Sequence, residues 1–144
     1  MINFIEGRIK LGAKSLLAFS SYDHINTLTQ EGLIEKRADR GGDYYYVEAV
    51  EDGMRFGVFV SLREKKVEWL RLHWLDSPMQ GWDDVSEKAV MDEYRLLCTF
   101  VEKNVGAPPD NKGNRQRAWR LKWGQLKVCY DMRAFQADIF MKPQ

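Results

Sequence analysis

The feature that most constrains the fold is an apolar stripe that runs through residues 85–105. Its members recur at steps of three and four, a spacing that places them on one side of an α-helix: Val90, Tyr94, Leu97, Cys98, Val101 and Val105. We expect Asp83 or Asp84 to cap the first turn. Gly106, with Pro108 two residues later, is typical of the end of a helix. A stripe of this length must be covered, so we expect the helix to pack on a sheet.

Before this helix the apolar period changes to two, which is typical of strands. Residues 44–50 and 54–61 alternate in this way and flank Glu51-Asp52-Gly53, where Asp-Gly favours a tight hairpin turn. Residues 67–75 continue the pattern, so the segment predicts a three-stranded meander. The alternation assigns the residues of the third strand to two faces, one with Leu70, Leu72 and Trp74 and the other with Trp69, Arg71 and His73.

The remaining segments complete a repeated order of helix and meander. Strand patterns follow the long helix in residues 117–123, 125–131 and 135–141. We expect an earlier helix over residues 13–29, with Ser20-Ser21 as a point that divides it. Strands that cluster, instead of alternating with helices, predict an α+β fold with two main helices and a mostly antiparallel sheet.

The length and composition are typical of a single soluble domain over residues 1–144. The chain is 44% hydrophobic and has a formal charge of +1, which disfavours both disorder and a strongly electrostatic nucleic-acid binder. No apolar run approaches the ~20 residues of a membrane span, and Glu6, Arg8 and Lys10 interrupt the amino-terminal segment where a secretory signal would be apolar. Two cysteines are too few for a disulfide framework. We therefore expect a cytoplasmic protein that makes no membrane contact.

Familiar catalytic and metal-binding signatures are missing from the sequence. It has no Gly-rich phosphate loop, no G-x-S-x-G elbow and no Cys or His pairs at zinc-ligand spacing. We expect no cofactor, no metal and no catalytic residue. His73 shares a strand face with Trp69 and Arg71, where it is either a general base or an imidazole on a half-exposed sheet, and we favour the second interpretation. The alternative is a small hydrolase or nucleic-acid-processing enzyme that uses His73 with nearby carboxylates or Arg71.

Charge is balanced overall but segregated along the chain. Residues 76–93 contain six carboxylates and one lysine, a formal charge of −5, whereas residues 103–122 contain six cations and one carboxylate, a formal charge of +5. Separated patches of this kind steer charged macromolecules, although solvated faces carry the same patterns. Five tryptophans add to the case for a protein partner, because Trp, Tyr and Arg dominate interface energy.

Two surfaces therefore compete as the contact site. A cationic partner would meet the acidic segment with Trp82 as an anchor, and an acidic partner would meet the basic segment with Trp119 as an anchor; we favour the acidic segment. The residues that we expect to bind a partner are Trp82, Asp83, Asp84, Glu87, Asp92, Arg115, Arg117 and Trp119.

Three short stretches together resemble a known group of proteins: Ile9-Lys10-Leu11-Gly12, Trp82-Asp83-Asp84-Val85-Ser86-Glu87, and Trp123-Gly124 leading to Tyr130-Asp131-Met132-Arg133. They resemble small bacterial cytoplasmic proteins that are encoded beside secreted antibacterial toxins and serve as immunity proteins. The resemblance implies a non-catalytic protein that neutralises a toxin by occluding it. The order of elements is also similar to small domains of the outer-membrane assembly lipoprotein and β-lactamase-inhibitor group, but we find no signal sequence or lipidated cysteine. A homodimer stays open as an alternative.

Overall fold

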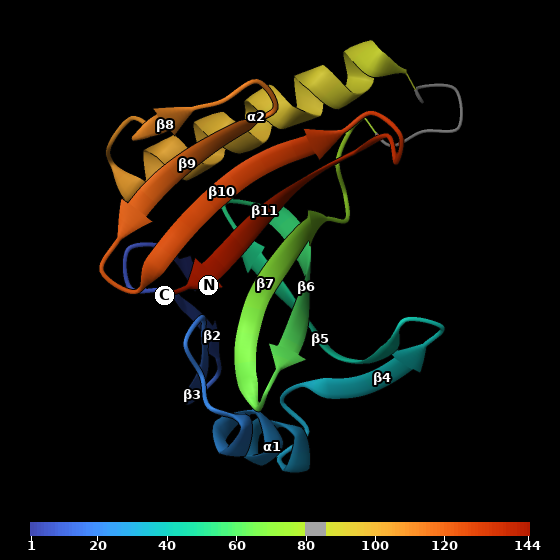
Figure 1. Ribbon diagram of the computed structural model, residues 1–144, viewed down its shortest axis with the longest axis vertical. Helices are drawn as coiled ribbons and strands as arrows, with labels where there is room; N and C mark the ends of the chain where they lie inside the picture. Colours follow the sequence, from blue (N-terminus) through green and yellow to red (C-terminus); the bar gives the residue numbers. More distant parts are fainter. Residues whose placement is uncertain (80–85) are drawn as a thin grey trace.

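The computed structural model describes residues 1–79 and 86–144 and has an α+β fold (Figure 1). The first half contains β1 (Ile2–Asn3), β2 (Arg8–Leu11), β3 (Lys14–Leu17), α1 (Tyr22–Gln30), β4 (Glu35–Asp39), β5 (Gly42–Glu51), β6 (Met54–Arg63) and β7 (Lys66–Trp74). The second half contains α2 (Glu87–Val105), β8 (Asn111–Lys112), β9 (Gln116–Leu121), β10 (Gly124–Asp131) and β11 (Gln136–Pro143). None of the helices in these ranges is long and apolar enough to cross a membrane.

The main sheet joins two antiparallel meanders through their last strands. Its order is β4-β5-β6-β7-β11-β10-β9-β8, and each neighbouring pair is antiparallel. The seam is the β7–β11 pair, in which His73 lies opposite Asp138 and Arg71 opposite Phe140. The predicted strands of both meanders are confirmed, and the structure adds the short edge strands β4 and β8. Pairing at the seam removes two open edges, so one continuous sheet replaces two small ones.

The amino-terminal prediction of a helix over residues 13–29 is wrong in its first half. Residues 14–17 form β3, which pairs with β2 in a three-stranded sheet of order β1-β2-β3. The helix begins only at Tyr22, because Ser21 is its N-cap and accepts a hydrogen bond from the His24 amide at 3.1 Å. Its buried residues are Ile25 and Leu28.

The predicted long helix is confirmed as α2, but its start differs from the prediction. Ser86, not Asp83 or Asp84, is the N-cap and accepts from the Ala89 amide at 3.1 Å. Gly106 ends the helix in the left-handed conformation, with φ of 78°, as predicted. The apolar stripe packs on β10 and β11, and Leu97 and Val101 are completely buried in this interface.

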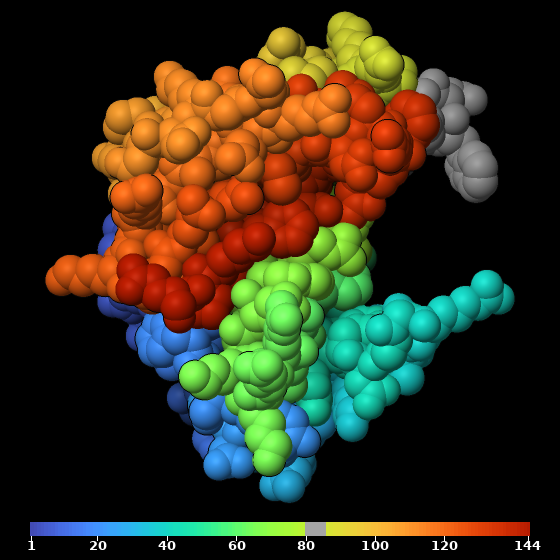
Figure 2. All heavy atoms as spheres, in the orientation of Figure 1, coloured from blue at the N-terminus to red at the C-terminus, as the bar shows by residue number. Residues whose placement is uncertain are grey.

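One continuous hydrophobic core lies between α2, the amino-terminal sheet and one face of the main sheet. Phe100 of α2 links the layers, since its ring lies 5.8 Å from that of Phe4 and 5.5 Å from that of Phe56. In Figure 1, α2 lies behind β9, β10 and β11, so the uncovered face of these three strands points toward the viewer. In the space-filling view that face is hollowed between the β10–β11 turn, β7 and the β4–β5 hairpin (Figure 2).

Candidate functional site

The candidate site is the open face, by which we mean the outward-pointing residues of the central strands. In β7, Trp69, Arg71 and His73 alternate with the buried Leu70 and Leu72, which confirms the predicted division of faces. Strand pairing extends the same face across the neighbouring strands. The open face carries Tyr44, Tyr46, Phe59, Trp69, Arg71, His73, Gln136, Asp138 and Phe140.

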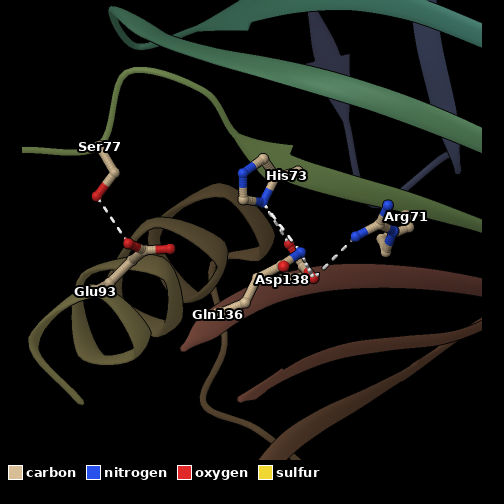
Figure 3. A network of polar contacts seen from close by, with 6 residues as sticks. All are labelled: Arg71, His73, Ser77, Glu93, Gln136 and Asp138. Atoms are coloured by element: carbon tan, nitrogen blue, oxygen red, sulfur yellow. Dashed lines mark hydrogen bonds and ion pairs between the residues drawn. The ribbon is translucent and has the colours of Figure 1, made fainter. Parts of the chain in front are cut away.

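A polar network at the β7–β11 seam centres on the carboxylate of Asp138 (Figure 3). Gln136 Nε2 donates to Asp138 Oδ2 at 2.7 Å, and Arg71 donates to the same oxygen at 3.4 Å. His73 Nδ1 lies 2.9 Å from Asp138 Oδ1. An ionised carboxylate only accepts hydrogen bonds, so this contact favours a proton on His73 Nδ1. The network thus fixes the orientation of both Arg71 and His73.

Aromatic rings and cations surround this network. The Phe59 ring centroid lies 5.0 Å from that of Tyr46 and 5.8 Å from that of Tyr44. The Arg71 guanidinium lies 4.3 Å from the Phe59 centroid, and the Arg37 guanidinium lies 3.9 Å from the Tyr46 centroid. These distances are those of cation–π contacts. Arg71 is therefore held by a carboxylate on one side and an aromatic ring on the other.

A second aromatic pair continues the open face away from this cluster. The rings of Trp69 and Phe140 meet edge to face at a centroid distance of 5.8 Å across the β7–β11 seam. Both side chains are half-buried, so each keeps part of its apolar surface in contact with solvent.

Burial raises the pKa of Tyr46 above its ordinary value, and the nearby Glu48 carboxylate raises it further. Tyr46 is therefore a neutral hydroxyl that donates to Glu48 at 3.3 Å.

The cysteines show no feature of a nucleophile. Cys129 is the register partner of Asp138 on β10, and burial raises the pKa of its thiol. Burial raises the pKa of the Cys98 thiol to about 11. A thiol must lose its proton to attack a substrate or bind a metal, so both environments oppose that chemistry. Within residues 1–79 and 86–144, no group of three His, Cys, Asp or Glu side chains could hold a metal ion.

A separate buried contact lies beyond the end of β7. Ser77 donates to Glu93 of α2 at 2.9 Å, and both residues are buried (Figure 3). The contact ties the segment after β7 to the helix. Glu93 contributes to the charge of −5 counted in residues 76–93, but its burial removes it from any partner surface.

The acidic residues predicted to bind a partner are only partly described. Trp82, Asp83 and Asp84 lie outside the described residues. Glu87 is exposed in the first turn of α2. Asp92 accepts from Lys88 at 3.0 Å and lies 3.6 Å from Arg95, so its charge is already balanced within the helix.

The basic residues predicted to bind a partner divide between the surface and the core. Arg115 is exposed, whereas Arg117 points inward, where it donates to the carbonyl of Gly113 at 3.0 Å and lies 5.9 Å from the ring centroid of Tyr94. Trp119 is 1% exposed and donates to the Ala107 carbonyl at 3.0 Å. The prediction of Trp119 as a surface anchor is therefore wrong. The pleat of β9 directs it into the core.

Several members of the open face were not predicted from the sequence. Asp138 and Gln136 lie on alternate positions of the predicted strand 135–141, so the period of two could have placed them on a common face. No local signal reveals that this face adjoins that of His73, because the β7–β11 pairing joins residues 65 positions apart.

The fold and the site define an α+β protein with one covered and one open sheet face. Comparisons with protein-family models, with curated proteins and with solved structures find no match for this chain.

Proposed function

We propose that this chain is a non-catalytic protein-binding module of the immunity type, which neutralises a cognate bacterial toxin in the cytoplasm by occluding it. The observation that carries the proposal is the open face, where Arg71 is fixed between Asp138 and Phe59 and is flanked by further aromatic rings. Tyr, Trp and Arg provide most of the binding energy in protein interfaces. The immunity role itself comes from the sequence resemblance.

The arrangement of these side chains favours binding because they are already ordered. Ordering a long side chain at an interface costs about 0.5–1.5 kcal/mol, and a side chain that is fixed beforehand avoids this cost. Arg71 and Arg37 are both stacked on aromatic rings before any partner arrives. The hollow in this face offers a complementary shape to a protruding element of a partner (Figure 2).

The test uses the product of the gene that adjoins the gene of this chain. Expressed alone the product should arrest bacterial growth, and co-expression of this chain should restore it. The Arg71→Ala variant should fail to restore growth while it remains folded by circular dichroism. The control is Arg63→Ala, since the Arg63 side chain is 75% exposed at the end of β6, away from the seam. A neighbour without toxicity, or rescue by both variants alike, contradicts the proposal.

A second candidate function is acid–base catalysis, which the His73–Asp138 distance of 2.9 Å favours. A carboxylate that orients an imidazole is a recurring part of hydrolytic sites. The binding function is preferred because stacked aromatic and cationic side chains, the Arg71–Phe59 and Trp69–Phe140 contacts among them, surround the pair, and such residues dominate interface energy. Hydrolysis of a p-nitrophenyl ester or phosphodiester that His73→Asn abolishes would support the enzyme and contradict the binding module.

A further inference from the structure

An apolar groove lies at the end of the main sheet, where the β9–β10 turn meets the amino-terminal segment. Its volume is about 740 Å³. Its apolar wall consists of Ile5, Phe19, Leu121 and Trp123, and it is separate from the polar network of the open face. Ile5 is 54% exposed and Phe19 is 52% exposed, and the two side chains line the same groove, so they form a contiguous apolar patch and not isolated surface residues. The groove therefore holds apolar surface that folding leaves uncovered.

The floor of this groove is rigid. The Trp123 indole N–H donates to the Phe4 carbonyl at 2.8 Å. The backbone carbonyl of Trp123 accepts from the Gln144 amide at 3.2 Å. The indole also packs directly over Gly7, where a Cβ atom would lie only 2.8 Å from Trp123 Cγ. Gly7 has a φ of +65°, so both its conformation and this contact favour glycine. A ligand would meet a preformed surface.

The rim of the groove is cationic. Arg120 and Lys122 both line it and are exposed. Neither forms an ion pair with a carboxylate in the described part of the chain, whereas Glu6, the acidic residue of the lining, pairs with Arg8 at 2.7 Å. Arg120 also borders an adjoining hollow that contains Lys142. The charged lining consists of three cations, Arg120, Lys122 and Lys142, and one carboxylate, Glu6. Asp110 adds a second carboxylate, which accepts from the Arg120 amide at 2.7 Å, so the net charge beside the uncovered apolar surface is positive.

We propose that this groove binds an acidic segment of a protein partner, with a large apolar side chain placed against Trp123 and flanking carboxylates on Arg120 and Lys122. A protein segment fits better than a membrane because a flat bilayer does not fill a concave groove. A small ligand fits less well because such sites usually bury about 70–90% of the ligand, and this groove is open on one side. The binding of an acidic segment rests on the proposed function in one respect, which is that the partner of this chain is a protein.

The test is an NMR titration of the 15N-labelled chain with a hexapeptide that carries a central phenylalanine-leucine pair between aspartate and glutamate residues. The indole N–H signal of Trp123, assigned with Trp123→Phe, reports binding directly. We expect a saturable shift that weakens with added salt and is not produced by the same peptide with lysines in place of the acidic residues. Arg120→Glu with Lys122→Glu should weaken binding by at least about tenfold.

Two controls separate the groove from general charge effects. The double variant Lys36→Glu, Arg40→Glu reverses the charge of one Lys and one Arg in the β4–β5 hairpin. It should bind the peptide as tightly as the parent chain does. Phe19→Ser should lose the peptide without a loss of fold, because Phe19 is half exposed. Arg71→Ala should bind the peptide normally, so failure of the open-face function and failure of the groove are distinguishable.

Several results would overturn the inference. The first is the absence of a saturable shift at millimolar peptide, and the second is equal binding by the Arg120→Glu, Lys122→Glu variant. The third is a protein that does not bind the peptide but co-sediments with vesicles of phosphatidylglycerol and phosphatidylcholine, and whose co-sedimentation is abolished by Phe19→Ser. That result would assign the groove to a membrane surface instead.

Discussion

Removal of the Asp138 carboxylate is the most direct test of the polar network. Asp138→Ala leaves Gln136, Arg71 and His73 without the acceptor that they share at 2.7, 3.4 and 2.9 Å. Asp138→Asn keeps the size of the side chain and one carbonyl oxygen but removes the negative charge. The two variants therefore separate the hydrogen bonds from the charge.

The expected magnitude follows from burial. Loss of one partner of a fully buried ion pair costs about 3–5 kcal/mol, whereas an exposed pair contributes about 0–1 kcal/mol. The side chains of Asp138, His73 and Arg71 are 10%, 22% and 27% exposed, so water replaces part of the lost contact. We expect Asp138→Ala to lower the free energy of unfolding by about 2–3 kcal/mol, and Asp138→Asn by about half as much.

The assay is urea unfolding followed by circular dichroism, with the free energy taken from the midpoint and slope. Asp43→Ala is the matched control, because Asp43 is an exposed carboxylate 3.5 Å from Lys36 and should change stability by less than about 0.5 kcal/mol. A double-mutant cycle of Asp138→Ala with Arg71→Ala should show coupling of at least about 0.5 kcal/mol. If Asp138→Ala is as stable as the control, the network does not hold the open face in place.

Three further predictions concern the core, the groove floor and the partly buried thiol of Cys98. Leu97→Ala should destabilise the protein by about 2–5 kcal/mol in the same assay, because Leu97 is completely buried and leaves a cavity. Gly7→Ala should lower the melting temperature, since the left-handed conformation alone costs an alanine about 1–2 kcal/mol and its Cβ would meet Trp123; an unchanged melting curve would mean that the turn adapts. Burial raises the pKa of Cys98 from 9.0 to about 11. The thiol therefore loses its proton at a lower pH in the unfolded chain than in the folded chain, and the free energy of unfolding should fall as the pH rises from about 9 to about 11. Cys98→Ala should flatten this part of the pH profile; a slope that is the same in both proteins would contradict the assignment.

Local physical chemistry explains why much of the fold is readable from the sequence. The stripe of α2, its end at Gly106 and the Asp52-Gly53 hairpin each depend on residues within a few positions of one another. Asp52 has a φ of +52°, as such a turn requires. The faces of β7 follow from the pleat alone, so the outward direction of His73 was predictable.

The failures arise where local signals compete. Residues 14–17 are Lys-Ser-Leu-Leu, a stretch that is compatible with a helix or a strand, and pairing with β2 decides for the strand. Asp83, Asp84 and Ser86 are all of residue types that cap helices well, and the sequence alone does not choose among them; in the structure the N-cap is Ser86. Trp119 adjoins charged residues in the sequence, but the orientation of β9 buries it.

The sequence by itself determined helix α2, the long strands of the two meanders and the residues that share a strand face, because periodicity and turn sterics act over short distances. Only the tertiary structure decided that β7 pairs with β11, which brings Asp138 to His73 and Arg71. It likewise decided that Trp123 packs against the turn at Gly7, more than a hundred residues away in the chain. Contacts of this kind depend on which surfaces the whole chain can bury together, and no local pattern encodes that choice.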